Sequence, residues 1–265
     1  IVLMSGLEER MAQEVSFKGT PYQEAVAVLA GMINCDYIHT SHYFAILPEE
    51  YLTLQYMNVR EQMGEPYKAM SASVAFGAKT ELFKVFSILG KSLEITIIAD
   101  NYIAEARCGE IFLSDSPLPV VIEAILQSAR ISPESFAVES TSEYIFIKAI
   151  KNKDLSSCLL NPSSLTSQQK MLLDTDVSLS LPDAKTMEQA PFLAQPIPLE
   201  DALRPLTEQL GVEIVAQRKL AEIPINPCVM NHVRLETALN LLLRQWPLPD
   251  FGFEVQENRI LIRAK

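Results

Sequence analysis

The feature that most constrains this chain is an internal repeat. The segment from Phe76 to Leu126 aligns without a gap with the segment from Leu193 to Leu243, at a constant offset of 117 residues (193 − 76). In both copies apolar residues fall at the i, i+3, i+4 and i+7 positions typical of an amphipathic helix. An apolar strand, an alternating strand and a second helix pattern follow in the same order. This repeat predicts a chain built from copies of one small folding unit.

A third, partial copy lies near the start of the chain. There Val15–Lys18 corresponds to Ile111–Ser114 at an offset of 96 residues (111 − 15) and is predicted to be a strand. A hairpin pattern closes this copy, after a helix whose core positions are Tyr22, Ala25, Val26 and Leu29. Only the second half of the unit is recognisable here. Its first half is missing, or is replaced by residues 1 to 12 or by another segment.

These patterns predict an α+β fold of tandem small βαββαββ modules, each with two helices packed on short mixed sheets. With 265 residues, 48% of them hydrophobic, the chain can bury the cores that such modules need. The predicted domains are a half-module at 1–48, a connector at 49–71, a complete module at 72–150, a connector at 151–190 and a complete module at 191–265. The second connector contains Val177, Leu179 and Leu181 in alternation with serines, which favours either a strand added to an open sheet edge or an irregular linker.

The net charge of −11 argues against nucleic acid as a partner, because an acidic surface repels phosphate backbones. The strand and helix order is similar to that of KH-type RNA-binding domains, but the G-x-x-G loop that clamps the backbone in those domains is absent. The longest apolar runs are far shorter than the ~20 residues that span a bilayer. We therefore expect no transmembrane segment, and the first residues show no signal peptide pattern.

No catalytic, cofactor-binding or metal-binding residues are predicted. The sequence lacks the glycine-rich phosphate loops and the nucleophile motifs of common enzyme classes, so we expect a non-enzymatic protein. His39 and His42 are ordinary hairpin residues in this interpretation, and His232 serves as a cap or faces solvent. Asp174 and Asp176 have no companion base or nucleophile and are assigned to a solvated loop.

Two further groups of polar residues receive structural interpretations. Ser114, Asp115 and Ser116 precede the second helix of the central copy and are predicted to form an N-cap cluster. The four cysteines contain no C-x-x-C pair, which excludes the usual zinc and thioredoxin-type motifs. Cys228 lies in an apolar stretch and is interpreted as a core residue, whereas the serine-rich surroundings of Cys158 favour an exposed thiol.

The candidate partner-binding residues are Trp246 and the alternating set Val177, Leu179 and Leu181. Trp246 is the only tryptophan and ends the last helix pattern. It is either an exposed anchor for a partner or a core residue packed under the proline-rich turn that follows.

The module pattern resembles the secretin and TonB N-terminal short domain. The similarity lies in the run Arg234–Leu243, with Leu235, Ala238 and Leu239 at the spacing found before the second helix in that family, and in the closing Arg259–Arg263. It covers 191–265 well, 72–150 fairly and 13–48 as a half-module. This resemblance implies a periplasmic or cell-envelope protein whose modules dock to other envelope proteins, in secretion channels or in signalling transducers.

The expected function is therefore a periplasmic interaction or scaffold protein with no cofactor, whose partners are other envelope proteins or copies of itself. Exposed strand edges would bind them by strand addition. The alternative is a module that binds a small molecule or peptidoglycan in a pocket between modules.

Overall fold

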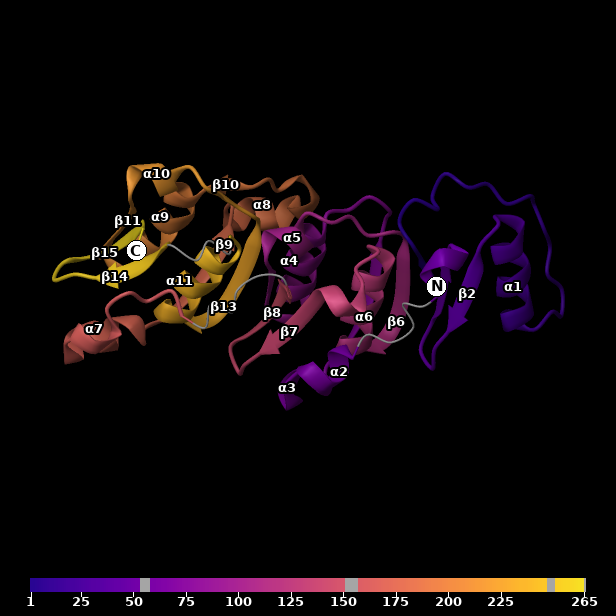
Figure 1. The fold of residues 1–265 in the computed structure, drawn as a ribbon, viewed down its shortest axis with the longest axis horizontal. Helices are drawn as coiled ribbons and strands as arrows, with labels where there is room; N and C mark the ends of the chain where they lie inside the picture. Colours follow the sequence, from indigo (N-terminus) through magenta and orange to yellow (C-terminus); the bar gives the residue numbers. More distant parts are fainter. Residues whose placement is uncertain (53–57, 151–156, 247–250, 265) are drawn as a thin grey trace. The chain divides into compact units, whose positions relative to one another are not determined.

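The computed structural model describes residues 1–52, 58–150, 157–246 and 251–264. They form two compact units, the first from Ile1–Leu82 and Glu105–Val138, the second from Phe83–Ala104 and Glu139–Lys265. Helices alternate with strands that form several small sheets (Figure 1), so the predicted α+β class is confirmed. The units cut across the predicted module of 72–150, and the tandem arrangement of modules stays a prediction.

Unit 1 contains a five-stranded mixed sheet in the order β2-β3-β1-β6-β4. Strand β1 is parallel to β3 and antiparallel to β6, so it joins the β2–β3 hairpin to the β4–β6 pair. Its strands are β1 (Val2–Leu3), β2 (Asp36–His39), β3 (Phe44–Leu47), β4 (Ser71–Phe76) and β6 (Ile111–Pro117). Its helices are α1 (Tyr22–Met32), α2 (Val59–Gln62), α3 (Glu65–Lys68) and α6 (Leu118–Ser128), with 3-10 turns at Glu49–Tyr51 and Pro133–Ser135.

Unit 2 contains two three-stranded sheets, ordered β5-β8-β7 and β11-β15-β14, and two pairs, β13-β9 and β10-β12. The chain passes between the units at the start of α4, at the end of α5 and within β7. The strands are β5 (Thr96–Ala99), β7 (Phe136–Ser140), β8 (Tyr144–Ala149), β9 (Asp176–Leu181), β10 (Ile197–Pro198), β11 (Glu213–Ala216), β12 (Pro224–Ile225), β13 (Cys228–Arg234), β14 (Phe251–Val255) and β15 (Arg259–Ala264). The helices are α4 (Leu82–Leu93), α5 (Asn101–Ala104), α7 (Ser167–Leu173), α8 (Ala184–Gln189), α9 (Leu199–Leu210), α10 (Arg218–Ala221) and α11 (Leu235–Arg244), with 3-10 turns at Pro162–Ser164 and Pro191–Leu193.

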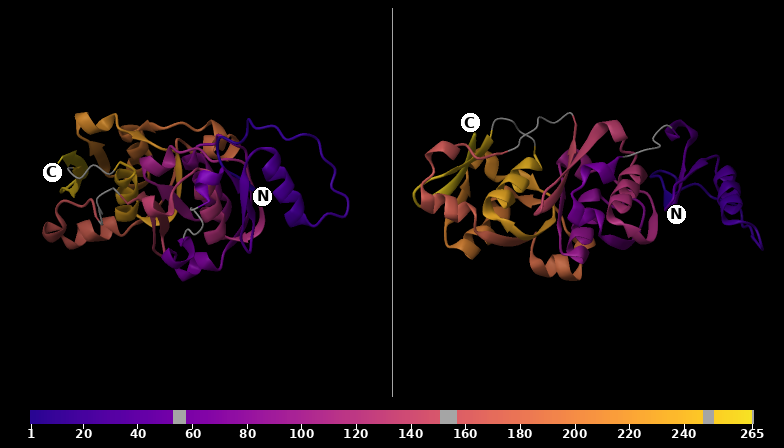
Figure 2. Two further views of the ribbon diagram at one scale, coloured as in Figure 1. Left: turned by 45° about the vertical axis from the view of Figure 1, so that its right-hand side comes forward. Right: turned by 90° about the horizontal axis from the view of Figure 1, so that it is seen from below.

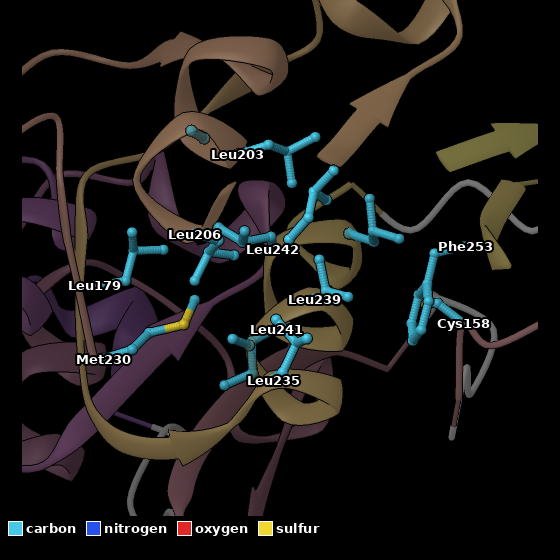
Figure 3. Close-up of a cluster of buried hydrophobic side chains, with 14 of the residues drawn as sticks. Cys158, Leu179, Leu203, Leu206, Met230, Leu235, Leu239, Leu241, Leu242 and Phe253 are labelled. Carbon is cyan, nitrogen blue, oxygen red and sulfur yellow. The ribbon is translucent and has the colours of Figure 1, made fainter. Parts of the chain in front are cut away.

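The core of unit 2 lies between helices α9 and α11 and the β9–β13 pair. Leu203 and Leu206 of α9 face Leu239 and Leu242 of α11, and Met230 of β13 approaches from the strand side (Figure 3). All of these side chains are buried. The 3.6-residue spacing of apolar positions in both helices explains why each presents one continuous apolar face to this core.

Elements of the repeated segments begin at equivalent residues. Helix α9 begins and ends 117 residues after α4, and β11 does so after β5. The pairing is also equivalent, because β5 lies parallel to β8 and β11 lies parallel to β15. The helix pattern of the partial copy behaves in the same way, since α1 begins and ends 96 residues before α6.

The strand that precedes the second helix carries a bulge at the same position in both complete copies. The β4–β6 register shifts next to Asp115, and the β9–β13 register shifts next to His232. Both residues have a left-handed backbone, with φ of 41° and 48°. In each case the backbone N–H donates to a serine hydroxyl on the neighbouring strand, Ser73 at 2.9 Å and Ser178 at 3.2 Å.

This bulge corrects the predicted N-cap cluster. Ser114, Asp115 and Ser116 lie within β6, and the N-cap of α6 is Pro117, with no side-chain capping bond. His232 is likewise a bulge residue of β13. A β-bulge uses short polar side chains that tolerate positive φ, and these are also the residue types favoured at caps. The two therefore look alike in sequence.

Two strand predictions have different outcomes. Val177, Leu179 and Leu181 lie in β9, so the predicted strand is confirmed, and it forms a two-stranded sheet with β13, as β4 pairs with β6 in the larger sheet of unit 1. The strand predicted at Val15–Lys18 is wrong, because this segment is irregular. The missing first half is replaced in part by β1, within residues 1 to 12. It lies parallel to β3 as β5 does to β8.

Candidate interaction site

Strands β2 and β4 are the outer strands of the sheet in unit 1. The Thr40 N–H donates to the Tyr43 carbonyl at 2.9 Å, which makes this residue pair hydrogen-bonded. Because hydrogen-bonded and non-hydrogen-bonded pairs alternate in an antiparallel ladder, the N–H groups of Tyr37 and His39 point away from β3. The Asp36 carboxylate accepts from the Tyr37 N–H at 2.8 Å. The outward N–H of His39 is positioned to pair with an added strand.

A groove of about 660 Å³ borders this hairpin. Its lining comes from the β2–β3 hairpin, from α2 and from α6. On its polar side it contains His39 and His42 from the hairpin, Arg60 from α2 and Glu123 from α6. Tyr43 lies at its inner edge and donates its hydroxyl proton to Gln127 Oε1 at 2.9 Å. A groove with both a guanidinium and a carboxylate can receive a ligand that carries opposite charges.

Glu123 is the carboxylic acid in the lining of this groove. It lies half-buried among the apolar residues of α6, and this burial raises its pKa to about 7. Burial, and to a smaller extent the nearby Glu123, also raises the pKa of Tyr43. Glu123 is not among the residues that the sequence predicts to be functional. The available signal was a lone acid in an otherwise apolar helix, Leu-Pro-Val-Val-Ile-Glu-Ala-Ile-Leu.

Unit 2 has a smaller polar cavity, of about 340 Å³, between the β7–β8 turn and α11. Glu143 from the turn accepts from the Arg234 backbone N–H at 2.8 Å and from the Thr237 hydroxyl at 2.9 Å, and its carboxylate also pairs with the Arg234 guanidinium. Burial raises the pKa of Glu143, but the hydrogen bonds from Arg234 and Thr237 outweigh it and lower the pKa. This carboxylate therefore stabilises the N-terminus of α11.

Arg244, in the last turn of α11, is buried and forms a two-point ion pair with Glu139 at 2.9 and 2.6 Å. Its guanidinium also lies 4.2 Å from the ring centroid of Phe146. Burial raises the pKa of Glu139, yet hydrogen bonds from Arg244 and Tyr144 outweigh it, so the pKa is lowered. Because each charged atom already has a partner inside unit 2, we assign this cluster a structural role.

The predicted partner-binding strand residues are not at the surface. Val177, Leu179 and Leu181 are buried in the core of unit 2, and the backbone of β9 pairs with β13 of the same chain. This placement corrects the interpretation of the three side chains as contacts for a partner. An alternating apolar strand pairs with the first suitable edge, and here the chain itself supplies that edge.

Trp246 is half-buried and packs against the core of unit 2. Its indole N–H donates to the Pro224 carbonyl oxygen. Both observations favour the core interpretation over the exposed anchor. The proline-rich turn predicted to cover it falls at 247–250, outside the described residues.

The remaining polar candidates are dispersed. His39 stacks on Phe44, with ring centroids 4.3 Å apart, while His232 pairs with Asp176 at 3.2 Å and Asp174 with Arg234 at 3.7 Å, all at the surface. Among the described residues, no three His, Cys, Asp or Glu side chains are grouped as a metal site would require.

The cysteines are free thiols. Cys228 is buried, as predicted, and burial raises its pKa to about 12. The exposed location predicted for Cys158 is wrong, because its side chain is buried in the core cluster of unit 2, and the next residue, Leu159, bridges to Phe253 of β14.

Comparison with protein families, with curated proteins and with solved structures finds no match to this chain. Within the described part of the chain, every helix is too short or too polar to span a bilayer.

Proposed function

We propose that this chain is a non-enzymatic interaction or scaffold protein of the periplasm or cell envelope, which binds other envelope proteins by strand addition. The location and the class of partner come from the resemblance to the secretin and TonB short N-terminal domain. The mode of binding is supported by the strand edges of unit 1. A homo-oligomer is the other arrangement that this proposal includes.

The observation that supports the proposal is that strands of this chain pair with segments distant in the sequence. Two segments of the predicted connector at 151–190 pair with strands of unit 2. Strand β9 lies antiparallel to β13, and Leu159 bridges in parallel to Phe253 at the edge of β14. In unit 1 the outward N–H of His39 on β2 offers the same kind of edge to another chain.

The groove next to β2 supports a second function, binding of a small molecule or a peptidoglycan fragment. Peptidoglycan stems carry both amines and carboxylates, which suit Glu123 and Arg60 on the lining of this groove. The groove function predicts that such fragments raise the melting temperature of the intact protein and that Glu123→Gln removes the increase. Strand addition alone predicts no such increase.

Site-specific crosslinking tests the main proposal. A photo-crosslinking residue replaces Ser41, in the exposed turn after β2, and a matched one replaces Lys185, on the exposed surface of α8. In envelope extract we expect a defined adduct from position 41 and none from position 185. Mapping of the adduct should identify one short segment of the partner.

Two substitutions at the strand edge decide whether a backbone pairing is responsible. His39→Pro removes the outward N–H, which should reduce the adduct about fivefold, the value of one backbone hydrogen bond. His39→Ala keeps the N–H and removes only the ring, so the adduct should remain. Equal yields at positions 41 and 185, or equal losses with proline and alanine, would contradict strand addition at β2.

A further inference from the structure

The irregular segment before α1 corresponds to a paired strand in the other two copies. Residues 15–21 align with β6 at an offset of 96 and with β13 at an offset of 213 (228 − 15). Gly19 has φ of 74°, at the position where the bulge residues Asp115 and His232 also have positive φ. The segment therefore already has the backbone feature that marks this strand.

The side chains that face the core in β6 and β13 face solvent here. Val15 and Phe17 are each 37% exposed, whereas their counterparts Cys228 and Met230 are 2% and 0% exposed. Figure 2 shows the segment as an irregular stretch in unit 1, without a strand arrow, ahead of α1. The alternation of residues 15–18 is typical of a strand, but no neighbouring strand covers their apolar side chains, which remain partly exposed.

Helix α1 also leaves apolar side chains exposed. Tyr22 and Val28 are 59% and 46% exposed, while the equivalent Leu235 and Leu241 of α11 are fully buried. Helix α11 packs against β13 and β9, and α1 packs against β2 and β3. The residues before α11 form strand β13, which pairs with β9. The residues before α1 form no strand and have no such partner.

We infer that residues 15–21, with the exposed Tyr22 and Val28 of α1, form an acceptor for an extended segment of another polypeptide, which pairs antiparallel with residues 15–18 as β9 pairs with β13. This inference deepens the proposed strand addition and rests on it. The internal copies define the occupant, because β4 and β9 both alternate apolar with small residues, as Ala72-Ser-Val74-Ala-Phe76 and Val177-Ser-Leu179-Ser-Leu181.

A second copy of this chain is a poorer occupant than a different protein. The strands with this pattern in the described residues, β4 and β9, are already paired with β6 and β13. Donation by a second copy would require one of these pairs to open and would expose Leu179 and Leu181, which are buried. A partner segment that is extended before binding avoids this loss.

The test uses the full chain and a synthetic peptide with the sequence of residues 174–183, which includes β9. In the register of β9 with β13, the peptide positions of Leu181 and Leu179 would lie opposite Val15 and Phe17. With saturating peptide, we expect amide hydrogen exchange of residues 15–18 and of α1 to slow at least about tenfold. A peptide with asparagine at the three apolar positions should leave exchange unchanged.

A matched pair of variants tests whether the slowing of hydrogen exchange by the peptide depends on the apolar side of residues 15–18, which carries Val15 and Phe17. Phe17→Asp places a charge where Phe17 would enter the core and should abolish the effect of the peptide. Ser16→Asp occupies the outward position, equivalent to the exposed Phe112, and should retain it. Each variant is compared with its own exchange without peptide, so a folding defect is seen directly.

Three results would overturn the inference. They are unchanged exchange at residues 15–18 in saturating peptide, equal losses for the two variants, and slowing of exchange by self-association of the chain without peptide. Because purified protein and peptide suffice, failure of crosslinking at β2 leaves this test intact. Failure here, with crosslinking at β2 preserved, would restrict strand addition to the β2 edge.

Discussion

Helices α1 and α11 occupy the same place in their copies of the repeat and differ in what surrounds them. Both follow a segment with a positive-φ residue, Gly19 before α1 and His232 before α11. Before α11 this segment is a strand paired with β9, whereas before α1 it is irregular. The helix forms in both cases. Because α1 packs against β2 and β3, it forms without a paired strand before it, whereas the strand itself requires a neighbour.

The largest expected difference between the two helices comes from one apolar position. Leu241→Ala should cost about 2–5 kcal/mol of unfolding free energy because it leaves a cavity in the core of unit 2. The equivalent Val28→Ala should change stability by less than about 0.5 kcal/mol, since Val28 is exposed and alanine favours a helix. Urea unfolding followed by Trp246 fluorescence measures the first, and hydrogen exchange of α1 the second. Equal costs would mean that α1 is covered in the free protein.

The last turn of each helix gives the next comparison. Arg244→Ala should cost roughly 3 kcal/mol, because Glu139 stays half-buried without its partner. At the equivalent position of α1, Gly31→Ala should gain about 0.5–1 kcal/mol, because nothing lies within 4 Å of the added methyl group. Urea unfolding measures Arg244→Ala, and hydrogen exchange of α1 measures Gly31→Ala.

The ion pair between Glu139 and Arg244 should also make the stability of the protein depend on pH in the acid range. The pKa of Glu139 is lowered in the fold, so its contribution to stability is complete above its ordinary value of 4.5 and is lost as the pH falls through the folded-state pKa. The double variant Arg244→Met, Glu139→Gln should lose this acid dependence and be more stable than Arg244→Ala. An unchanged acid profile in the double variant would show that other carboxylates determine it.

One residue before Leu241 and Val28, at Asn240 of α11 and Ala27 of α1, the equivalent residue of α6 is Glu123. The pKa of Glu123 is raised from 4.5 to about 7, so the neutral form is favoured in the fold. Its stabilising contribution is complete below pH 4.5 and is lost as the pH rises through 7. Glu123→Gln should remove this dependence and gain roughly 1–2 kcal/mol at pH 8, reduced from the full shift because the side chain is partly solvated. Thermal unfolding across this pH range measures it.

The last comparison concerns the bulge. His232→Gly should gain about 0.5–1 kcal/mol, because glycine adopts φ of 48° without strain. His232→Ala loses the same exposed ring but keeps the strain, so it should be close to neutral. Gly19→Ala should lower the free energy of unfolding by a similar amount, about 0.5–1 kcal/mol. The cause is backbone strain at φ of 74°, because nothing lies within 4 Å of the added methyl group. Equal free energies of unfolding for His232→Gly and His232→Ala would contradict the claim that backbone strain at this residue lowers stability.

Several residues show how far the sequence alone could predict this structure. The helical spacing of Leu199, Leu203 and Leu206 predicts α9, and the alternation of Val177, Leu179 and Leu181 predicts β9. Both predictions depend on which side chains share a face, and this follows directly from the order of residues. The candidate groove was not predicted, because Arg60 and Glu123 come from different helices and only the fold brings them together.

The sequence by itself determined the α+β class and the main helices of the repeated segments, because these depend on residues close together in the chain. The short helices α2, α3, α7 and α8 lie in segments predicted to be connectors. Tertiary structure alone decided which strands became paired. Val15–Lys18 and Cys228–Arg234 have similar alternating patterns, yet one is irregular and the other is a buried strand. The physical reason is that a strand satisfies its backbone hydrogen bonds and buries its apolar face only against another strand. Whether such a strand lies within reach is a property of the whole fold.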